Sequence, residues 1–73
     1  FNKAIEFEWF HPYVYNSKGN VLLKLGKIKQ EMEYKEKAIS YYKAAISSFD
    51  KAIELKKDYA NAYMNKGRAL SDL

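Results

Sequence analysis

Residues 15–22 read Tyr-Asn-Ser-Lys-Gly-Asn-Val-Leu, and 48 positions later residues 63–70 repeat the pattern as Tyr-Met-Asn-Lys-Gly-Arg-Ala-Leu. The similarity extends on both sides, because residues 1–25 and 49–73 share ten identical positions. Two unrelated segments of this length are expected to share only one or two identical positions. A pattern that returns at a fixed spacing indicates a protein built from similar units that stack on one another.

A shorter period lies inside the longer one. The tripeptide Lys-Ala-Ile of residues 3–5 recurs at residues 37–39, 34 positions on, and related tripeptides follow at seven-residue steps, at 44–46 and 51–53. Seven residues make almost two helical turns, so an added heptad rotates the apolar face of a helix by only about 20°. We therefore expect a 34-residue helical repeat whose second helix carries an insertion of 14 residues, or two heptads.

Apolar periodicity predicts a first helix over about residues 12–25. Pro12 suits its first turn, where the missing N–H is harmless. Gly26 suits its C-terminus, because glycine enters the left-handed backbone region freely. One apolar stripe recurs at helical spacing and consists of Val14, Lys18, Val21, Leu22 and Leu25. Lys18 is its single polar member.

The second helix is expected at about residues 28–56, where apolar residues recur at threes, fours and sevens without proline or glycine. A break at residues 33–36, where the apolar pattern thins, is the alternative. A third helix is expected from Tyr59 to the end, and residues 1–8 are expected to be the tail of a preceding helix. The chain begins with phenylalanine and its helical pattern runs to the last residue, so we expect it to be part of a longer protein.

Two sets of residues carry a family resemblance: Tyr15, Gly19 and Leu22, and again Tyr63, Gly67 and Leu70. They resemble the first helix of tetratricopeptide repeats. Alanines at the positions typical of second helices strengthen the resemblance: Ala4, Ala45 and Ala52. The proline that usually closes each unit is absent, and Trp9 and Lys57 stand in its place.

The resemblance implies an all-α fold of helix-turn-helix repeats, a fragment of an α-solenoid or superhelix. Residues 1–11 would end a preceding repeat, residues 12–58 would form one repeat with an elongated second helix, and residues 59–73 would be the first helix of the next. Aromatic residues crowd the junction at residues 7–13, where their rings either pack between helices or form an exposed patch. We favour packing.

The resemblance also implies a function: members bind a peptide or partner segment on a concave face lined by first helices. The side chains expected to face that groove are Tyr13, Asn16, Asn20, Lys24, Asn61, Met64, Asn65 and Arg68. Asparagine amides both donate and accept hydrogen bonds, and Lys and Arg attract carboxylates. The alternative is self-association, in which the Ala-Ile heptads, flanked by Tyr34, Tyr41, Tyr42 and Phe49, pack against the same helix of another copy.

Other functions find little support in the composition. The 73 residues suffice for one small domain, and the absence of cysteine excludes disulfides and thiolate metal sites. His11 is the single histidine and has no companion at ligand spacing, so we expect no metal, no cofactor and no enzymatic activity. The net charge of +4 is spread along the chain, so nucleic acid is not an expected partner. No apolar stretch of about 18 residues occurs, so we expect no membrane insertion and a cytoplasmic location.

Overall fold

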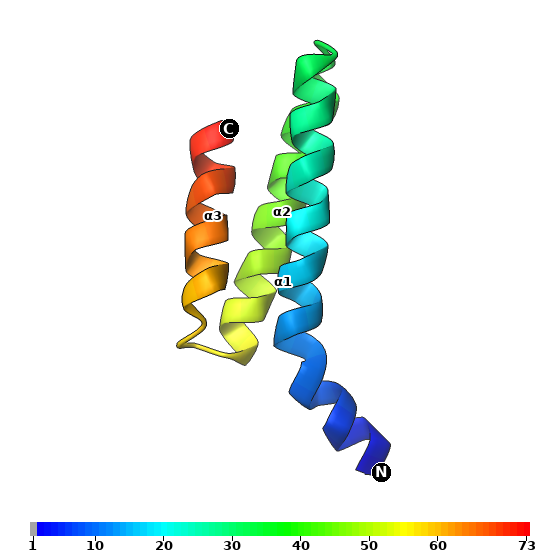
Figure 1. Ribbon diagram of the computed structural model, residues 1–73, viewed down its shortest axis with the longest axis vertical. Coiled ribbons are helices and arrows are strands. Elements are labelled where there is room, and N and C mark those ends of the chain that lie inside the picture. The colour runs from blue at the N-terminus through cyan, green and yellow to red at the C-terminus, as the bar shows by residue number, and fades with distance from the viewer. Residues whose placement is uncertain (1) are drawn as a thin grey trace.

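The computed structural model describes the backbone of residues 2–73 and the side chains of residues 11–73. The chain folds into three helices, α1 (Asn2–Glu31), α2 (Lys35–Leu55) and α3 (Ala60–Asp72). Helices α1 and α2 form an antiparallel hairpin, and α3 lies beside α2 (Figure 1). The green tip of the hairpin reaches beyond the end of α3. No strand occurs among residues 2–73, which confirms the all-α prediction.

Helix α1 is longer than predicted at both ends. We expected it to begin at Pro12 and to stop at Gly26, but the helix continues through both residues. The preceding helix expected at residues 1–8 is therefore not separated from α1 over the described part, residues 2–8. Pro12 removes one helical hydrogen bond, and a proline inside a helix is a common cause of a kink. Figure 1 shows the dark blue start of α1 bending away from the rest of the helix.

The turn that ends α1 lies at Met32–Tyr34. Glu33 has a φ of 66°, in the left-handed region. The Tyr34 N–H donates to the Lys29 carbonyl at 2.9 Å, and the Glu33 N–H donates to the Gln30 carbonyl at 3.0 Å. This pair of bonds is the Schellman arrangement, in which a left-handed residue closes a helix. The prediction of one helix over residues 28–56 is therefore wrong, and the alternative break near residues 33–36 is confirmed to within a residue or two.

The two helices of the hairpin meet through two glycine–aromatic contacts. A Cβ added to Gly26 would lie 2.6 Å from a ring carbon of Tyr42, closer than side chains pack. A Cβ added to Gly19 would overlap the ring of Phe49 in the same way. The two glycines are seven residues apart in α1, and the two aromatic residues are seven apart in α2. The backbone of α1 can therefore lie close against both rings.

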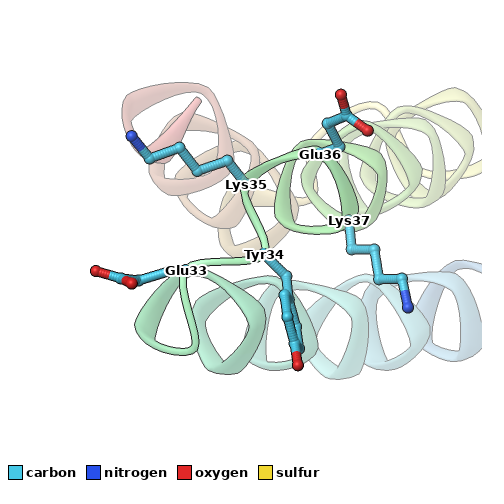
Figure 2. A pocket seen from close by; sticks show the side chains of 5 residues that line it. All are labelled: Glu33, Tyr34, Lys35, Glu36 and Lys37. Carbon is cyan, nitrogen blue, oxygen red and sulfur yellow. The ribbon is translucent and has the colours of Figure 1, made fainter.

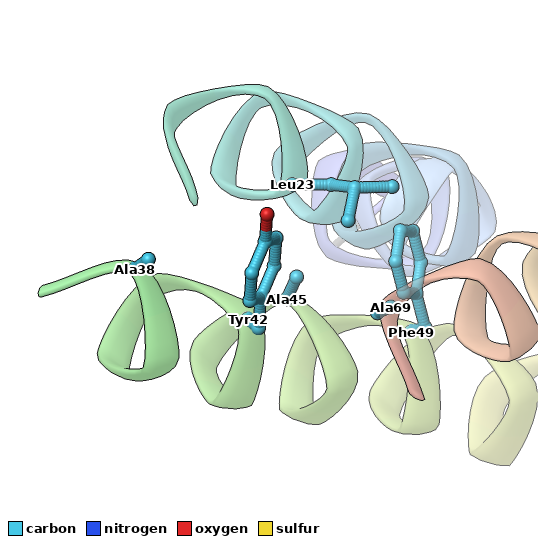
Figure 3. Close-up of a cluster of buried hydrophobic side chains, with 6 residues drawn as sticks. All are labelled: Leu23, Ala38, Tyr42, Ala45, Phe49 and Ala69. Atoms are coloured by element: carbon cyan, nitrogen blue, oxygen red, sulfur yellow. The ribbon is translucent and has the colours of Figure 1, made fainter. Parts of the chain in front are cut away.

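Alanines bring α3 close to α2. Ala45 and Ala52 of α2 and Ala62 and Ala69 of α3 are fully buried. Ala69 belongs to the same core cluster as Leu23, Ala38, Tyr42, Ala45 and Phe49, which Figure 3 shows between the helices. Small residues on both helices shorten the distance between their axes, so the core is thin and is filled mainly by the two aromatic rings.

The hairpin continues past the contact of Gly19 with Phe49 on both of its helices. Helix α1 runs past Gly26 to Glu31, and α2 is 21 residues long, with the turn between them. The insertion of 14 residues expected in the second helix stays a prediction. The contact of Gly26 with Tyr42 is a second copy of the contact of Gly19 with Phe49, placed one heptad nearer the tip. Both helices of the hairpin thus extend at least one heptad beyond the contact of Gly19 with Phe49.

Candidate functional site

A hollow of about 320 Å³ lies between α1 and α3, the two helices that share the repeated sequence pattern. Four of the eight residues predicted to bind a partner line it, Asn20 and Lys24 from α1 and Asn65 and Arg68 from α3. The other two lining residues are Leu23 and Lys27. We call this the α1–α3 hollow.

Two polar contacts join α1 and α3 on either side of this hollow. The Asn65 Nδ2 donates a hydrogen bond to the Asn16 Oδ1 at 3.1 Å. Toward the tip of the hairpin, the Lys27 Nζ lies 3.8 Å from the Asp72 carboxylate. These contacts connect the two helices on both sides of the hollow, and the buried Asn16–Asn65 bond is the stronger of the two because the Lys27 side chain is half exposed.

Asn16 and Asn65 occupy a different position from the one predicted. Both were expected to face the groove, but they are only 8% and 9% exposed and they bond to each other. A buried polar group without a partner costs about 1–3 kcal/mol, and this bond removes that cost for the Asn65 Nδ2 and the Asn16 Oδ1. Their amides connect α1 to α3. Asn65 lines the hollow only with the small part of its surface that stays exposed.

The other three predicted residues do not line the hollow. Tyr13 lies at the N-terminal end of α3, where its ring meets that of Tyr59 edge to face at 5.4 Å. Asn61 and Met64 are exposed on α3, and Met64 shows 61% of its surface. A ligand held only in the α1–α3 hollow would therefore not need these three side chains.

The α1–α3 hollow is positively charged. Lys27 is matched by Asp72, but Lys24 and Arg68 form no ion pair with any side chain of residues 11–73. Both are exposed, and Asn20 between them is half-buried. Leu23, 5% exposed, supplies an apolar floor. Two unmatched cations above an apolar floor favour an anionic group that carries some apolar surface.

Leu23 and Lys27 line the hollow although the repeat pattern did not place them there. With a helix end assigned to Gly26, Lys27 would fall in a turn and could not be placed beside α3. A signal was nevertheless present, because Lys27 and Asp72 carry opposite charges and pair between α1 and α3 at one end of the hollow. Leu23 carries no such signal, since an isolated leucine in an amphipathic helix usually marks core packing.

A second hollow, of about 390 Å³, lies where α3 ends against the hairpin. It is lined by Gln30, Glu33, Lys35, Ala38, Ile39, Tyr42, Asp72 and Leu73. The Tyr42 hydroxyl donates to the Gln30 Oε1 at 2.6 Å. Burial, followed by the charges of Asp72 and Glu31, raises the pKa of the Tyr42 phenol above 10.0. Tyr42 is therefore a neutral hydrogen-bond donor and does not act as a base near neutral pH.

The side chains at the tip of the hairpin, residues 33–37, are exposed and line a further hollow. In Figure 2 Tyr34 and Lys37 extend to the same side, whereas Glu36 points the opposite way. The Tyr34 ring has the ammonium groups of Lys29 and Lys37 each 5.7 Å from its centroid. Such cation–π contacts at exposed sites contribute about 0.5–1 kcal/mol, so they serve to hold the turn.

Within residues 11–73 the structure holds no cluster of His, Asp or Glu side chains that could bind a metal ion. The ring of His11 packs edge-on against Tyr15, with centroids 6.2 Å apart. Among the described helices none combines the length and apolar character needed to cross a bilayer. Of the aromatic residues in the segment 7–13, those up to residue 10 lie outside the described side chains. Their predicted packing between helices therefore stays a prediction.

Comparison with known families identifies the chain. The sequence model of the family described as tetratricopeptide repeat matches residues 12–44 and 40–59. These matches cover more than half of the chain, so the protein belongs to the tetratricopeptide repeat family. They overlap within α2, where the heptads recur. No curated protein matches the chain, and no solved structure matches it.

Proposed function

We propose that the α1–α3 hollow binds an extended, acidic segment of a partner protein. Tetratricopeptide repeats are generally protein–protein interaction modules, so a protein partner is the expected class of ligand. The observation that carries the proposal is the pair of unmatched cations, Lys24 on α1 and Arg68 on α3, that line one hollow.

The remaining lining residues suit a peptide. The Arg68 guanidinium can donate two parallel hydrogen bonds to a carboxylate, whereas Lys24 offers a single charge on a long stem. The Asn20 amide can donate to a peptide carbonyl and accept from a peptide N–H. A volume of about 320 Å³ lies at the small end of ligand pockets, enough for one acidic side chain or a chain terminus.

A peptide of ten residues that alternates glutamate and alanine, labelled with a fluorophore, tests this proposal by anisotropy. Lys24→Ala and Arg68→Ala should each lower the affinity about three- to tenfold, because each removes a charge-assisted hydrogen bond. A matched peptide with glutamine in place of glutamate should bind more weakly to the unaltered chain. The control variant is Lys43→Ala, which removes an exposed cation of α2 that does not line the hollow.

Equal losses for Lys24→Ala and Lys43→Ala would contradict the proposal, since the peptide would then respond only to overall charge. Unchanged affinity in Lys24→Ala and Arg68→Ala would contradict it as well. Spectra of the backbone amides recorded during the titration add a second criterion. The largest shifts should fall on Asn20, Lys24 and Arg68.

The alternative of self-association through the heptads gains no support from side-chain positions. Tyr42 and Phe49, two of the aromatic residues that would form the interface, are 1% and 0% exposed inside one chain. Only the outer residues of that set, such as Tyr34, are available to a second copy. Light scattering over a tenfold range of concentration distinguishes a monomer near 8.6 kDa from a dimer.

A further inference from the structure

The turn between α1 and α2 holds an exposed tyrosine beside two lysines. The centroid of the Tyr34 ring is 5.7 Å from the ammonium nitrogen of Lys29 on α1 and 5.7 Å from that of Lys37 on α2. Neither lysine forms an ion pair with a carboxylate of residues 11–73. We call these three residues the lysine–tyrosine cluster.

The nearest carboxylates of the turn point away from this cluster. In Figure 2 Tyr34 and Lys37 extend to one side of the turn, whereas Glu36 points the opposite way and Glu33 extends outward from the tip. Both glutamates are exposed, and neither pairs with a lysine in the part of the chain that includes these side chains, residues 11–73. The surroundings of the Tyr34 ring therefore favour added negative charge.

The other six tyrosines lack this combination of exposure, turn position and unmatched cations. Tyr42 is buried, and Tyr63 is 52% exposed but lies inside α3. Tyr59 has one lysine over its ring, Lys56, and that lysine already donates to Asp58. The remaining three, at positions 13, 15 and 41, lie inside α1 or α2. Tyr34 is thus distinct among the tyrosines of this chain.

The backbone at Tyr34 suits an enzyme that binds its substrate as an extended segment. A φ of −89° and a ψ of 72° place Tyr34 outside the helical region, and Glu33 before it is held in the left-handed conformation. That conformation is unfavourable for a residue with a Cβ, so opening the turn releases this cost while it breaks the bonds that close α1. Local opening can therefore present Tyr34 without unfolding the core of the hairpin.

We propose that the Tyr34 hydroxyl is a phosphorylation site and that Lys29 and Lys37 hold the added phosphate. The phosphoryl donor is a nucleoside triphosphate bound by a protein tyrosine kinase. The Tyr34 oxygen forms a bond to the γ-phosphorus, the bond from that phosphorus to the leaving diphosphate breaks, and the hydroxyl proton passes to a base of the kinase.

The phosphate would connect the two helices of the hairpin. It brings a charge of about −1.5 to −2 at pH 7 and three strong acceptor oxygens. One lysine from α1 and one from α2 then meet the same group across the turn. The three lysines and three glutamates of residues 29–37 cancel, so the modification makes this end of the hairpin negative. The lysine–tyrosine cluster lies outside the α1–α3 hollow, so this proposal does not depend on the proposed peptide site.

A kinase reaction tests the choice of tyrosine. The full chain is incubated with a protein tyrosine kinase of broad specificity and magnesium ATP, and mass spectrometry after digestion locates the phosphate. Tyr34 should be modified about fivefold faster or more than Tyr63, the control that is equally exposed but lies inside a helix. Tyr34→Phe should remove most of the uptake. Uptake that does not favour Tyr34 would overturn the proposal.

Phosphorus NMR of the full chain, synthesised with a phosphate on Tyr34, tests the role of the lysines. The second pKa of such a phosphate is ordinarily about 6. Because nearby cations favour the charged form, this pKa should be lower by about 0.5 in the folded chain than in urea. Lys29→Gln and Lys37→Gln should each return it toward the value in urea. Lys35→Gln is the matched control, because Lys35 extends away from Tyr34 in Figure 2.

Thermal unfolding of the same synthetic chain tests the connection between the helices. The phosphate should raise the melting temperature, and the double variant of Lys29→Gln and Lys37→Gln should remove that gain. Circular dichroism establishes that each variant is folded. Equal effects of Lys35→Gln and Lys37→Gln on the phosphate pKa would contradict the holding role of the cluster. A melting temperature lowered by the phosphate would contradict it too, since repulsion from the glutamates would then exceed attraction to the lysines.

Discussion

Gly26 of α1 lies directly against the ring of Tyr42 in α2, and this contact repeats that of Gly19 with Phe49 one heptad away. In each case a residue without a Cβ allows a helix backbone to reach an aromatic ring. A glycine inside a helix costs about 1 kcal/mol relative to alanine. Each of the two contacts therefore has to offset that cost for its own glycine. The third glycine, Gly67 in α3, has no atom within 4 Å of where its Cβ would lie.

Replacement of these glycines by alanine should therefore have effects of opposite sign. Gly67→Ala should raise the free energy of unfolding by up to about 1 kcal/mol, because it improves helix propensity and meets no neighbour. Gly26→Ala should lower it by about 1–2 kcal/mol, since the methyl group forces the Tyr42 ring to move. Urea denaturation measures both. A stabilising Gly26→Ala would show that the ring has room to shift, contrary to the packing described.

The bond between Asn16 and Asn65 predicts a coupling between distant parts of the sequence. Asn16→Ala and Asn65→Ala should each lower the free energy of unfolding by about 1–2 kcal/mol, because each leaves a buried amide without its partner. The double variant should cost less than the two single costs combined. Asn20→Ala, at a half-buried position nearby, is the control and should change little. Strict additivity, within about 0.5 kcal/mol, would argue against the bond.

The turn between α2 and α3 predicts a shifted titration. The Lys56 Nζ donates to the Asp58 carboxylate at 3.1 Å, and this bond together with the lysine charge holds the pKa of Asp58 below 3.8. The folded chain therefore keeps Asp58 ionised at a pH where the unfolded chain takes up a proton. The associated stability is present above pH 4 and is lost as the pH falls through the folded pKa.

Carbon-detected NMR of the Asp58 carboxyl measures this pKa. Lys56→Met should return it toward 3.8, whereas Lys57→Met, which removes a neighbouring charge without a hydrogen bond, should change it less. Equal shifts in the two variants would show that the general field of the lysines, and not the bond, sets the value.

The two glycine–aromatic contacts, one heptad apart, predict how the hairpin tolerates deletion. Removal of residues 25–31 alone, or of residues 35–41 alone, leaves one helix a heptad longer than its partner and pulls the turn out of place. Removal of both segments restores matched lengths and keeps the contact of Gly19 with Phe49. The double deletion should therefore unfold at a higher temperature than either single deletion, as measured by circular dichroism. The reverse order would contradict the matched positions of the two contacts.

The helices and the family could be predicted from the sequence because they depend on patterns that repeat. The Tyr-x3-Gly-x2-Leu pattern and the alanine positions identify first and second helices without any knowledge of their ends. Lys24 and Arg68 could be assigned to one surface because Arg68 is the repeat equivalent of Asn20, which lies four residues before Lys24 on the same side of α1.

The end of the second helix near residue 56 and the start of the third at Tyr59 were predicted to within one residue. The extent of α1 and the burial of the asparagines could not be predicted, because they depend on contacts between segments distant in sequence. Gly26 has the composition of a helix end, and only its contact with Tyr42 explains why the helix continues. Glu33 closes the helix in a left-handed conformation that side chains other than glycine and asparagine seldom adopt. Asn16 has the polarity of a surface residue, and only its bond to Asn65 accounts for its burial.

The contact of Gly26 with Tyr42 lies toward the far end of the hairpin, while the alanines that join α2 to α3 lie nearer its base. A repeat of this kind can therefore differ in length from its neighbours without disturbing the joint between them. In an array of otherwise uniform units, a hairpin that projects beyond its neighbours would make one position along the solenoid different in shape from all the others.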